Sequence, residues 1–145
     1  YEMQRSLVGS EMCIRDSTSP THVVLAFAKA LEELKEEGGI PARAKRYEEN
    51  NRLLIEKMKE FGIQPYIDAE HQGTIITTFF YPDSHDFSFA EMYEFIKERG
   101  YAIYPGKVTE ADTFRIGNIG EIYREDILRL VEIFREFFKL HGMEV

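Results

Sequence analysis

The sequence contains a single cysteine, Cys13, and no tryptophan in 145 residues. One cysteine has no partner within the chain, so an internal disulfide is excluded and a reducing, cytoplasmic setting is expected. The four histidines do not combine with Cys13 in any metal-ligand spacing, and we predict no zinc site; they are His22, His71, His85 and His141. Neither a Walker loop, a G-x-G-x-x-G run nor a nucleophile elbow occurs.

Long apolar runs are also absent. No stretch reaches the roughly 18–20 residues needed to span a bilayer, and the start shows no positive stretch followed by an apolar block. Positive charge is scarce, because 18 Lys and Arg stand against 26 Asp and Glu, for a net charge of -8. This balance argues against nucleic acid and anionic membranes as partners. What is present, 43% hydrophobic and 13% aromatic residues, is enough for one ordinary domain.

Residues 1–17 do not match the rest of the chain, since they show neither helical nor strand periodicity. Within them, residues 6–17 resemble a translated sequencing adapter; the alternative is a disordered natural terminus. Both interpretations predict little structure. We therefore treat residues 1–17 as a non-native or disordered leader and give Cys13 no functional role.

Two helices are predicted within residues 18–62. Pro20 favours a helix start just after it, and Gly38-Gly39 ends this helix. The second helix begins at Pro41 and ends at Gly62. Apolar residues recur three or four apart on one face of each helix: Val24, Phe27, Leu31 and Leu34 in the first, and Ala44, Tyr47, Leu54, Met58 and Phe61 in the second.

Strand and helix patterns alternate in residues 63–145. Strands are predicted at 63–67, at 74–81, at 101–104 and around Arg115; Pro65 makes the first an edge strand, and bulky residues on both faces suggest that 74–81 is covered on two sides. A helix capped by Ser88 runs to Gly100. A last helix closes at Gly142. This order predicts an α+β fold, a small and mostly antiparallel sheet with helices packed on it.

Arg115 is the most informative single residue. It lies in the strand-like run Thr113-Phe114-Arg115-Ile116-Gly117, between apolar neighbours. Its guanidinium is always charged and offers a rigid fork of N–H donors that matches a carboxylate bidentately. The alternative is a surface arginine on a sheet edge. The spacing alone favours the surface arginine, and the surrounding sequence reverses that preference.

Five phrases occur in a fixed order: TSPTHVV at 18–24, EGG at 37–39, ARAKRY at 42–47, YPGK at 104–107 and FRIG at 114–117. Together they resemble the C-terminal part of the alanine–glyoxylate (class V) branch of fold-type-I pyridoxal-phosphate aminotransferases. Within that branch they are most similar to the enzymes that act on 2-aminoethylphosphonate and pyruvate. The resemblance extends from residue 18 to about residue 140.

The resemblance implies that residues 18–62 are connecting helices, that residues 63–145 are the C-terminal small domain, and that the large cofactor-binding domain is missing. The lysine that binds pyridoxal 5'-phosphate covalently lies upstream in the family, so this chain alone is expected to be inactive. Lys107, at a predicted loop tip, is expected to be a solvated lysine and not its replacement. The complete enzyme is expected to be a homodimer with small-molecule substrates.

The resemblance assigns a role to two residues. Arg115 matches the arginine that binds the substrate carboxylate. Thr18 matches a threonine that donates to the cofactor phosphate of the neighbouring subunit; its alternative is a helix N-cap or a turn residue before Pro20. The implied reaction moves the amino group of 2-aminoethylphosphonate to pyruvate, which gives phosphonoacetaldehyde and alanine.

Two other functions stay open at the level of sequence. One is an alanine–glyoxylate or serine–pyruvate transaminase of the same branch, since Arg115 does not discriminate between amino donors. The other is a non-enzymatic α+β module that binds an anion or a partner. A physical consequence also follows from the missing domain: Leu31 and Leu34 lose their cover, and the isolated chain is expected to associate.

Overall fold

The computed structural model describes residues 20–84, 87–106 and 111–143. The expected leader at 1–17 lies outside these residues. The chain divides into two compact units, Tyr1–Arg43 and Ala44–Val145, each taken by itself below. The expected division into connecting helices and a small domain stays a prediction.

The first unit contains α2 (Thr21–Glu36) and the first turn of α3 (Gly39–Glu60). The main-chain N–H groups of Val23 and Val24 donate to the oxygen of Pro20, which confirms a helix start just after the proline. Gly38, with φ 108°, lies between the two helices in a left-handed conformation that favours glycine. No residue of α2 is buried.

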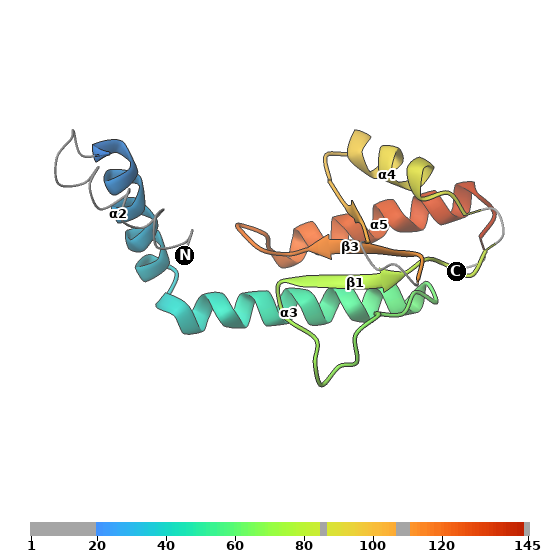
Figure 1. Cartoon of the computed structure of the whole chain (residues 1–145), viewed down its shortest axis with the longest axis horizontal. Helices are drawn as coiled ribbons and strands as arrows, with labels where there is room; N and C mark the ends of the chain where they lie inside the picture. The colour runs from blue at the N-terminus through green and yellow to red at the C-terminus, as the bar shows by residue number, and fades with distance from the viewer. Residues whose placement is uncertain (1–19, 85–86, 107–110, 144–145) are drawn as a thin grey trace, which may run out of the picture. The chain divides into compact units, whose positions relative to one another are not determined.

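The second unit is built on a three-stranded antiparallel sheet (Figure 1). Its strands are β1 (Ile76–Phe80), β2 (Tyr104–Pro105) and β3 (Thr113–Gly117), in the order β1-β3-β2. The central strand is therefore β3, which pairs antiparallel with both neighbours. This sheet and the helices beside it confirm the predicted α+β class.

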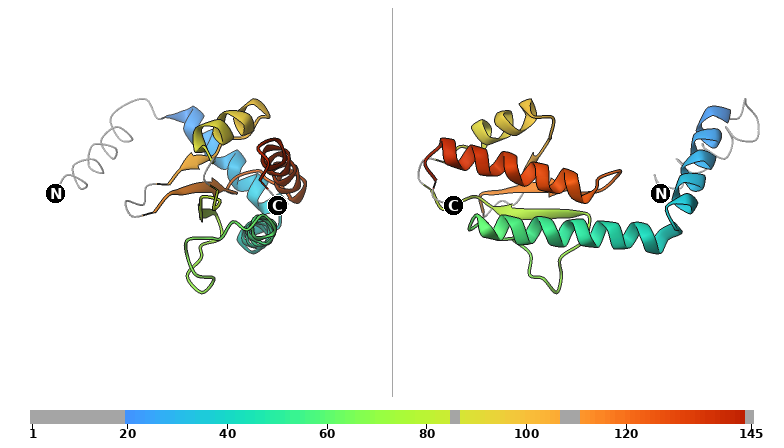
Figure 2. Two further views of the ribbon diagram at one scale, coloured as in Figure 1. Left: turned by 90° about the vertical axis from the view of Figure 1, so that its right-hand side faces the viewer. Right: turned by 180° about the vertical axis from the view of Figure 1, so that it is seen from behind.

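The helices α3, α4 (Phe89–Glu98) and α5 (Arg124–Leu140) bury the core against one face of the sheet. α5 and the later part of α3 lie on the same side of the strands (Figure 2). Apolar residues at helical spacing supply the core together with alternate strand residues; fully buried examples are Leu54, Met58, Phe79, Met92, Phe114 and Phe134. The predicted cap of α4 is present, because Glu91 N donates to Ser88 Oγ at 3.4 Å.

Three strand predictions need correction. Residues 63–67 form only an isolated bridge, Pro65 to Phe79, flanked by hydrogen bonds from Tyr66 N to Thr78 O and from Phe80 N to Gln64 O at 2.8 and 3.0 Å. The strand predicted at 74–81 is shorter, and the one at 101–104 is paired only at Tyr104–Pro105. The expected cover on both faces of β1 is wrong for this chain, since Ile76 is 47% and Phe80 is 37% exposed.

Candidate anion-binding site

Arg115 lies in the middle of β3, with a strand on either side. Its Cα partner is Thr78 on β1 and Tyr104 on β2. A central strand is held by ladder hydrogen bonds along both edges, so the backbone at Arg115 is fixed from two sides. The residue singled out in the sequence therefore stands on a rigid element and not on a sheet edge.

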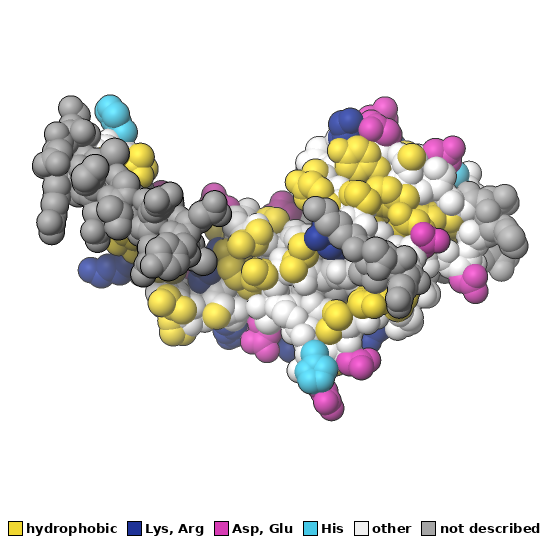
Figure 3. Space-filling model, viewed as in Figure 1, with side chains coloured by type: hydrophobic (Ala, Val, Ile, Leu, Met, Phe, Trp, Pro, Cys, Tyr) yellow, Lys and Arg dark blue, Asp and Glu magenta, His cyan; other side chains and the backbone are white. Residues whose placement is uncertain are grey.

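Strand alternation decides which way Arg115 points. Its neighbours Phe114 and Ile116 are buried in the core, so Arg115 projects from the opposite side of the sheet. We call this side the open face; the strand residues on it include Ile76, Thr78, Phe80, Tyr104 and Arg115. Figure 3 looks onto this side of the second unit and shows hydrophobic side chains at its surface.

The guanidinium of Arg115 is left without a counter-charge by the described part of the chain. Its Nε is buried and has no hydrogen-bond partner there. No described carboxylate forms an ion pair with it, although the whole chain has a net charge of -8. A buried donor without a partner is unfavourable by about 1–3 kcal/mol. The charge of the guanidinium is left for an anion from outside the described chain, so the residue suits binding of a carboxylate or a related anion.

The segment after β2 approaches β3 very closely beside this site. Gly106 N donates to the main-chain oxygen of Thr113 at 2.7 Å. A Cβ at residue 106 would lie 1.9 Å from the Oγ1 of Thr113, which no nonbonded contact allows. Only glycine fits there, so this member of the YPGK phrase holds β2 against β3. Thr113 is itself buried, and its hydroxyl has no hydrogen-bond partner among the described residues.

Buried polar side chains, none of which was predicted from the sequence, join α3 to the sheet. Asn118 Nδ2 donates to the main-chain oxygens of Tyr47 and Thr74 at 3.1 and 3.0 Å. Asn51 Nδ2 donates to Thr77 Oγ1 at 2.7 Å. Asn118, Asn51 and Thr77 are all buried. These bonds fix the end of β3 that lies beyond Arg115. The only signal of them in the sequence was Asn118 itself, which stands between Gly117 and Gly120 directly after the strand.

A second set of contacts fixes the loop between β3 and α5. Arg46 Nη1 donates to the oxygens of Gly120 and Ile122 at 2.8 and 3.0 Å. The guanidinium carbon of Arg46 also lies 5.2 and 5.0 Å from the ring centres of Tyr47 and Tyr123. Stacking and charge-assisted bonds of this kind restrain a loop. Arg46 belongs to the ARAKRY phrase, and no role was predicted for it from the sequence.

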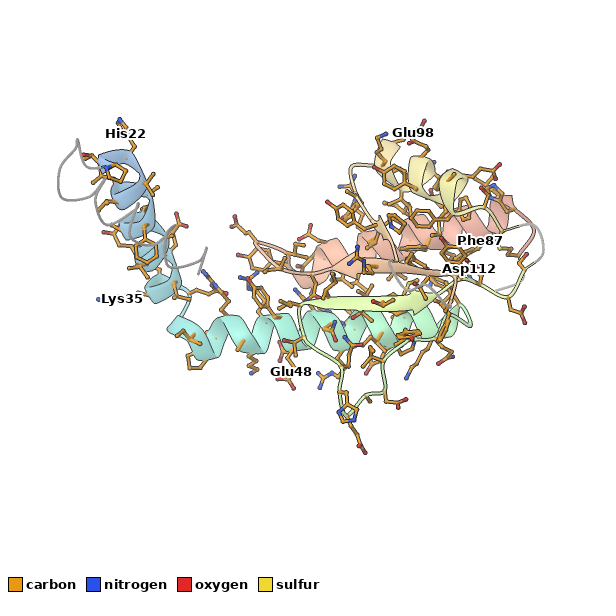
Figure 4. All side chains as sticks on the ribbon, in the orientation of Figure 1. His22, Lys35, Glu48, Phe87, Glu98 and Asp112 are labelled. Carbon is orange, nitrogen blue, oxygen red and sulfur yellow. The ribbon has the colours of Figure 1, made fainter. Side chains whose placement is uncertain are left out.

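Aromatic rings fix the other end of β3. Asp112, labelled in Figure 4 with Phe87, accepts from Tyr81 N through its main-chain oxygen at 3.0 Å. The Tyr81 ring lies 5.0 Å from Phe87 and 5.7 Å from Phe89 between centres. Burial raises the pKa of Tyr81, and the charge of Asp112 raises it further. Both ends of the strand that carries Arg115 are thus restrained.

Two residues named from the sequence, Thr18 and Lys107, lie outside the described residues, and their roles stay predictions. Among the residues that the structure describes, no three His, Cys, Asp or Glu side chains gather in a way that could hold a metal ion. None of the described helices is both long enough and apolar enough to cross a membrane.

The fold is that of part of a fold-type-I aminotransferase. An alanine–glyoxylate aminotransferase from Nostoc sp. superimposes with a TM-score of 0.72 at 20% identity, over 82% of this chain and 32% of the other. An aspartate aminotransferase from Thermus thermophilus superimposes with a TM-score of 0.58 at 22% identity, over 76% and 29%. Identities this low show the shared fold alone.

Curated relatives are more specific. The chain is 52% identical over 127 residues to the 2-aminoethylphosphonate–pyruvate transaminase of Lysinibacillus sphaericus, which is 88% of this chain and 34% of the relative. It is 54% identical over 119 residues to the 2-aminoethylphosphonate–pyruvate transaminase of Bacteroides fragilis, which is 82% of this chain and 33% of the relative. No family model matches. The resemblance noted in the sequence is confirmed, and the chain spans about a third of the length of these relatives.

Proposed function

We propose that this chain is part of a pyridoxal-phosphate-dependent transaminase that moves the amino group of 2-aminoethylphosphonate to pyruvate. Support comes from identities of 52% and 54% to enzymes of that name. The structural observation that carries the proposal is Arg115, a cation on a central strand whose buried Nε has no partner in the described chain. The products are phosphonoacetaldehyde and alanine, and the complete enzyme is a homodimer in the cytoplasm.

Arg115 binds the carboxylate of pyruvate or alanine in this proposal. The planar fork takes both carboxylate oxygens at once, which fixes the orientation of the substrate as well as its position. Because β3 is paired on both sides, the backbone that carries the fork stays in place when the substrate changes.

The cofactor, when bound, supplies the electron sink for amino transfer. The chemistry of the described donors fits a substrate more than the cofactor itself, because a guanidinium without a described counter-charge suits a carboxylate. In the proposal Thr18 donates its hydroxyl to the cofactor phosphate, and the covalent lysine belongs to a part of the enzyme outside this chain. In this proposal the present chain therefore positions the substrate.

Replacing Arg115 tests the proposal. In the complete enzyme, Arg115→Lys keeps the charge but removes the bidentate fork. We expect kcat/KM with pyruvate to fall roughly 10–100-fold, about 1.5–3 kcal/mol of recognition. Arg52→Lys is the matched control, because Arg52 is exposed on α3. Unchanged KM and turnover with pyruvate in Arg115→Lys would show that the assigned role is wrong.

The isolated 145-residue chain provides a second test. If residues outside it complete the site, calorimetry with pyruvate or with inorganic phosphate at millimolar concentration should show no heat of binding. A saturable heat that Arg115→Lys abolishes would instead favour a free-standing anion-binding module and contradict the proposal.

A further inference from the structure

We infer that Tyr104 determines the specificity of the Arg115 site, because its phenol hydroxyl donates to the third oxygen of a phosphonate. This inference rests on the proposed function, and it adds a residue and a chemical reason to it. The row of side chains Tyr104, Arg115 and Thr78 across the three strands carries it.

The register places Tyr104 beside Arg115. The two residues are Cα partners in the antiparallel pair of β2 and β3, so both side chains leave the sheet on the open face. Directly opposed Cβ atoms in such a pair lie roughly 4.5–5.5 Å apart. Tyr104 is 59% exposed, and none of the described residues hydrogen-bonds to its hydroxyl. The phenol is thus available to a ligand held by its neighbour.

Thr78, the partner of Arg115 on β1, has a shorter side chain than Tyr104. Its hydroxyl sits one bond beyond Cβ, close to the sheet, while the polar ends of Tyr104 and Arg115 lie several bonds further out. An anion that meets the end of the guanidinium therefore meets the phenol hydroxyl and not the threonine hydroxyl. The flanking strand residues Ile76 and Phe80 have apolar side chains and offer no donor.

The two substrates differ in the number of oxygens that they present. A carboxylate has two, and the arginine fork takes both. A phosphonate has three, so one oxygen remains after the fork is filled. Because the two substrates occupy the site in turn, a single guanidinium serves both, and Tyr104 finds an oxygen without an arginine bond only when a phosphonate is present. The hydroxyl is a neutral donor, so it adds no charge that would also tighten the carboxylate.

The experiment is to measure the two half-reactions of the complete enzyme separately. For Tyr104→Phe we expect kcat/KM with 2-aminoethylphosphonate to fall about tenfold, the usual effect of losing one hydrogen bond to a charged group. With pyruvate it should stay within about twofold. Tyr93→Phe is the matched control, since Tyr93 is a half-buried tyrosine of α4 packed beside Phe89. It should leave both half-reactions unchanged.

Inhibition gives a second measurement that does not depend on turnover of the phosphonate. Methylphosphonate and acetate should both compete at the site at one fixed pH. Tyr104→Phe should weaken methylphosphonate about tenfold and leave acetate unchanged. An equal loss for both anions, or no loss for methylphosphonate, would overturn the inference. Arg115→Lys separates the two proposals: if it weakens both anions while Tyr104→Phe weakens neither, only the inference about Tyr104 fails.

Discussion

The side-chain amide of Asn118 donates to the main-chain oxygen of Tyr47, 3.1 Å away on α3. The same amide donates to the oxygen of Thr74, 3.0 Å away and just before β1. Asn118 is fully buried, and it directly follows β3. One side chain therefore joins α3 and the segment before β1 to the Gly117 end of β3.

Removing this side chain should destabilise the fold strongly. In Asn118→Ala the oxygens of Tyr47 and Thr74 lose their shared donor inside the protein. We expect a loss of about 2–4 kcal/mol in the free energy of unfolding, measured by urea denaturation. Thr74→Ala is the control, because it keeps the main-chain oxygen and should stay within about 0.5 kcal/mol. Equal stability of the two variants would show that the Asn118 bonds contribute little.

The contact between Gly106 and Thr113 leads to a second prediction. Gly106→Ala would bring a methyl group to 1.9 Å from the hydroxyl oxygen of Thr113, so β2 must move away from β3. We expect a destabilisation of about 1–3 kcal/mol, together with a lower kcat/KM of the complete enzyme because Tyr104 and Arg115 no longer align. Gly73→Ala is a matched control, since a Cβ there meets nothing within 4 Å. A fully stable and active Gly106→Ala enzyme would contradict this account.

Because of Tyr101, the free energy of unfolding should depend on pH in the alkaline range. Burial raises its pKa above the ordinary value of 10.0; Asp126 raises it further, and Arg129 opposes this. The folded state therefore favours the neutral phenol. This contribution to stability is fully present below pH 10.0 and is lost as the pH rises through the folded pKa. The unfolding free energy of the chain should consequently decline above about pH 10.

Tyr101→Phe tests this dependence. Near pH 7 the variant loses the hydrogen bond from the phenol to the Asp126 main-chain oxygen, 3.1 Å long, and should be about 0.5–1.5 kcal/mol less stable. Above pH 10 its stability should fall less steeply than that of the unchanged chain. Adding Tyr81→Phe should flatten the curve further, because the pKa of Tyr81 is raised as well. Identical slopes for all three proteins would refute the assignment.

Sequence alone predicted the helices better than the strands. Apolar residues at helical spacing and the stops at Gly38-Gly39 and Gly62 placed α2 and α3 almost correctly, because these signals are local. The ends of β1 and β2 depend on which residues a partner strand reaches, and the strand predicted at 63–67 pairs with β1 only at the Pro65–Phe79 bridge.

The same distinction holds for the candidate site. Arg115 could be named from its residue type and its phrase. The side chains that hold its strand could not, because their partners are main-chain oxygens far along the chain: Asn118 and Tyr47 are 71 positions apart, and Arg46 and Gly120 are 74. A main-chain acceptor leaves no mark in the sequence. These bonds become visible only in the folded structure, where α3 lies beside the end of β3.

The exposed apolar side chains of α2 lead to the last prediction. Val24, Phe27 and Leu31 are 59%, 63% and 49% exposed, and Leu34 is half-buried. Apolar surface in water costs about 25 cal/mol per Å² relative to its burial. The 145-residue chain should therefore associate, and its mean mass in sedimentation equilibrium should rise with concentration.

Charge placed on that apolar stripe should prevent the association. We expect the double variant Phe27→Lys and Leu31→Lys to sediment as a monomer of about 17.0 kDa at concentrations where the unchanged chain is larger. Glu32→Lys with Glu36→Lys changes charge on the polar positions of α2 and serves as the control, which should still associate. A monomer of the unchanged chain at every concentration would mean that these side chains are tolerated in water, and α2 would then need no partner surface.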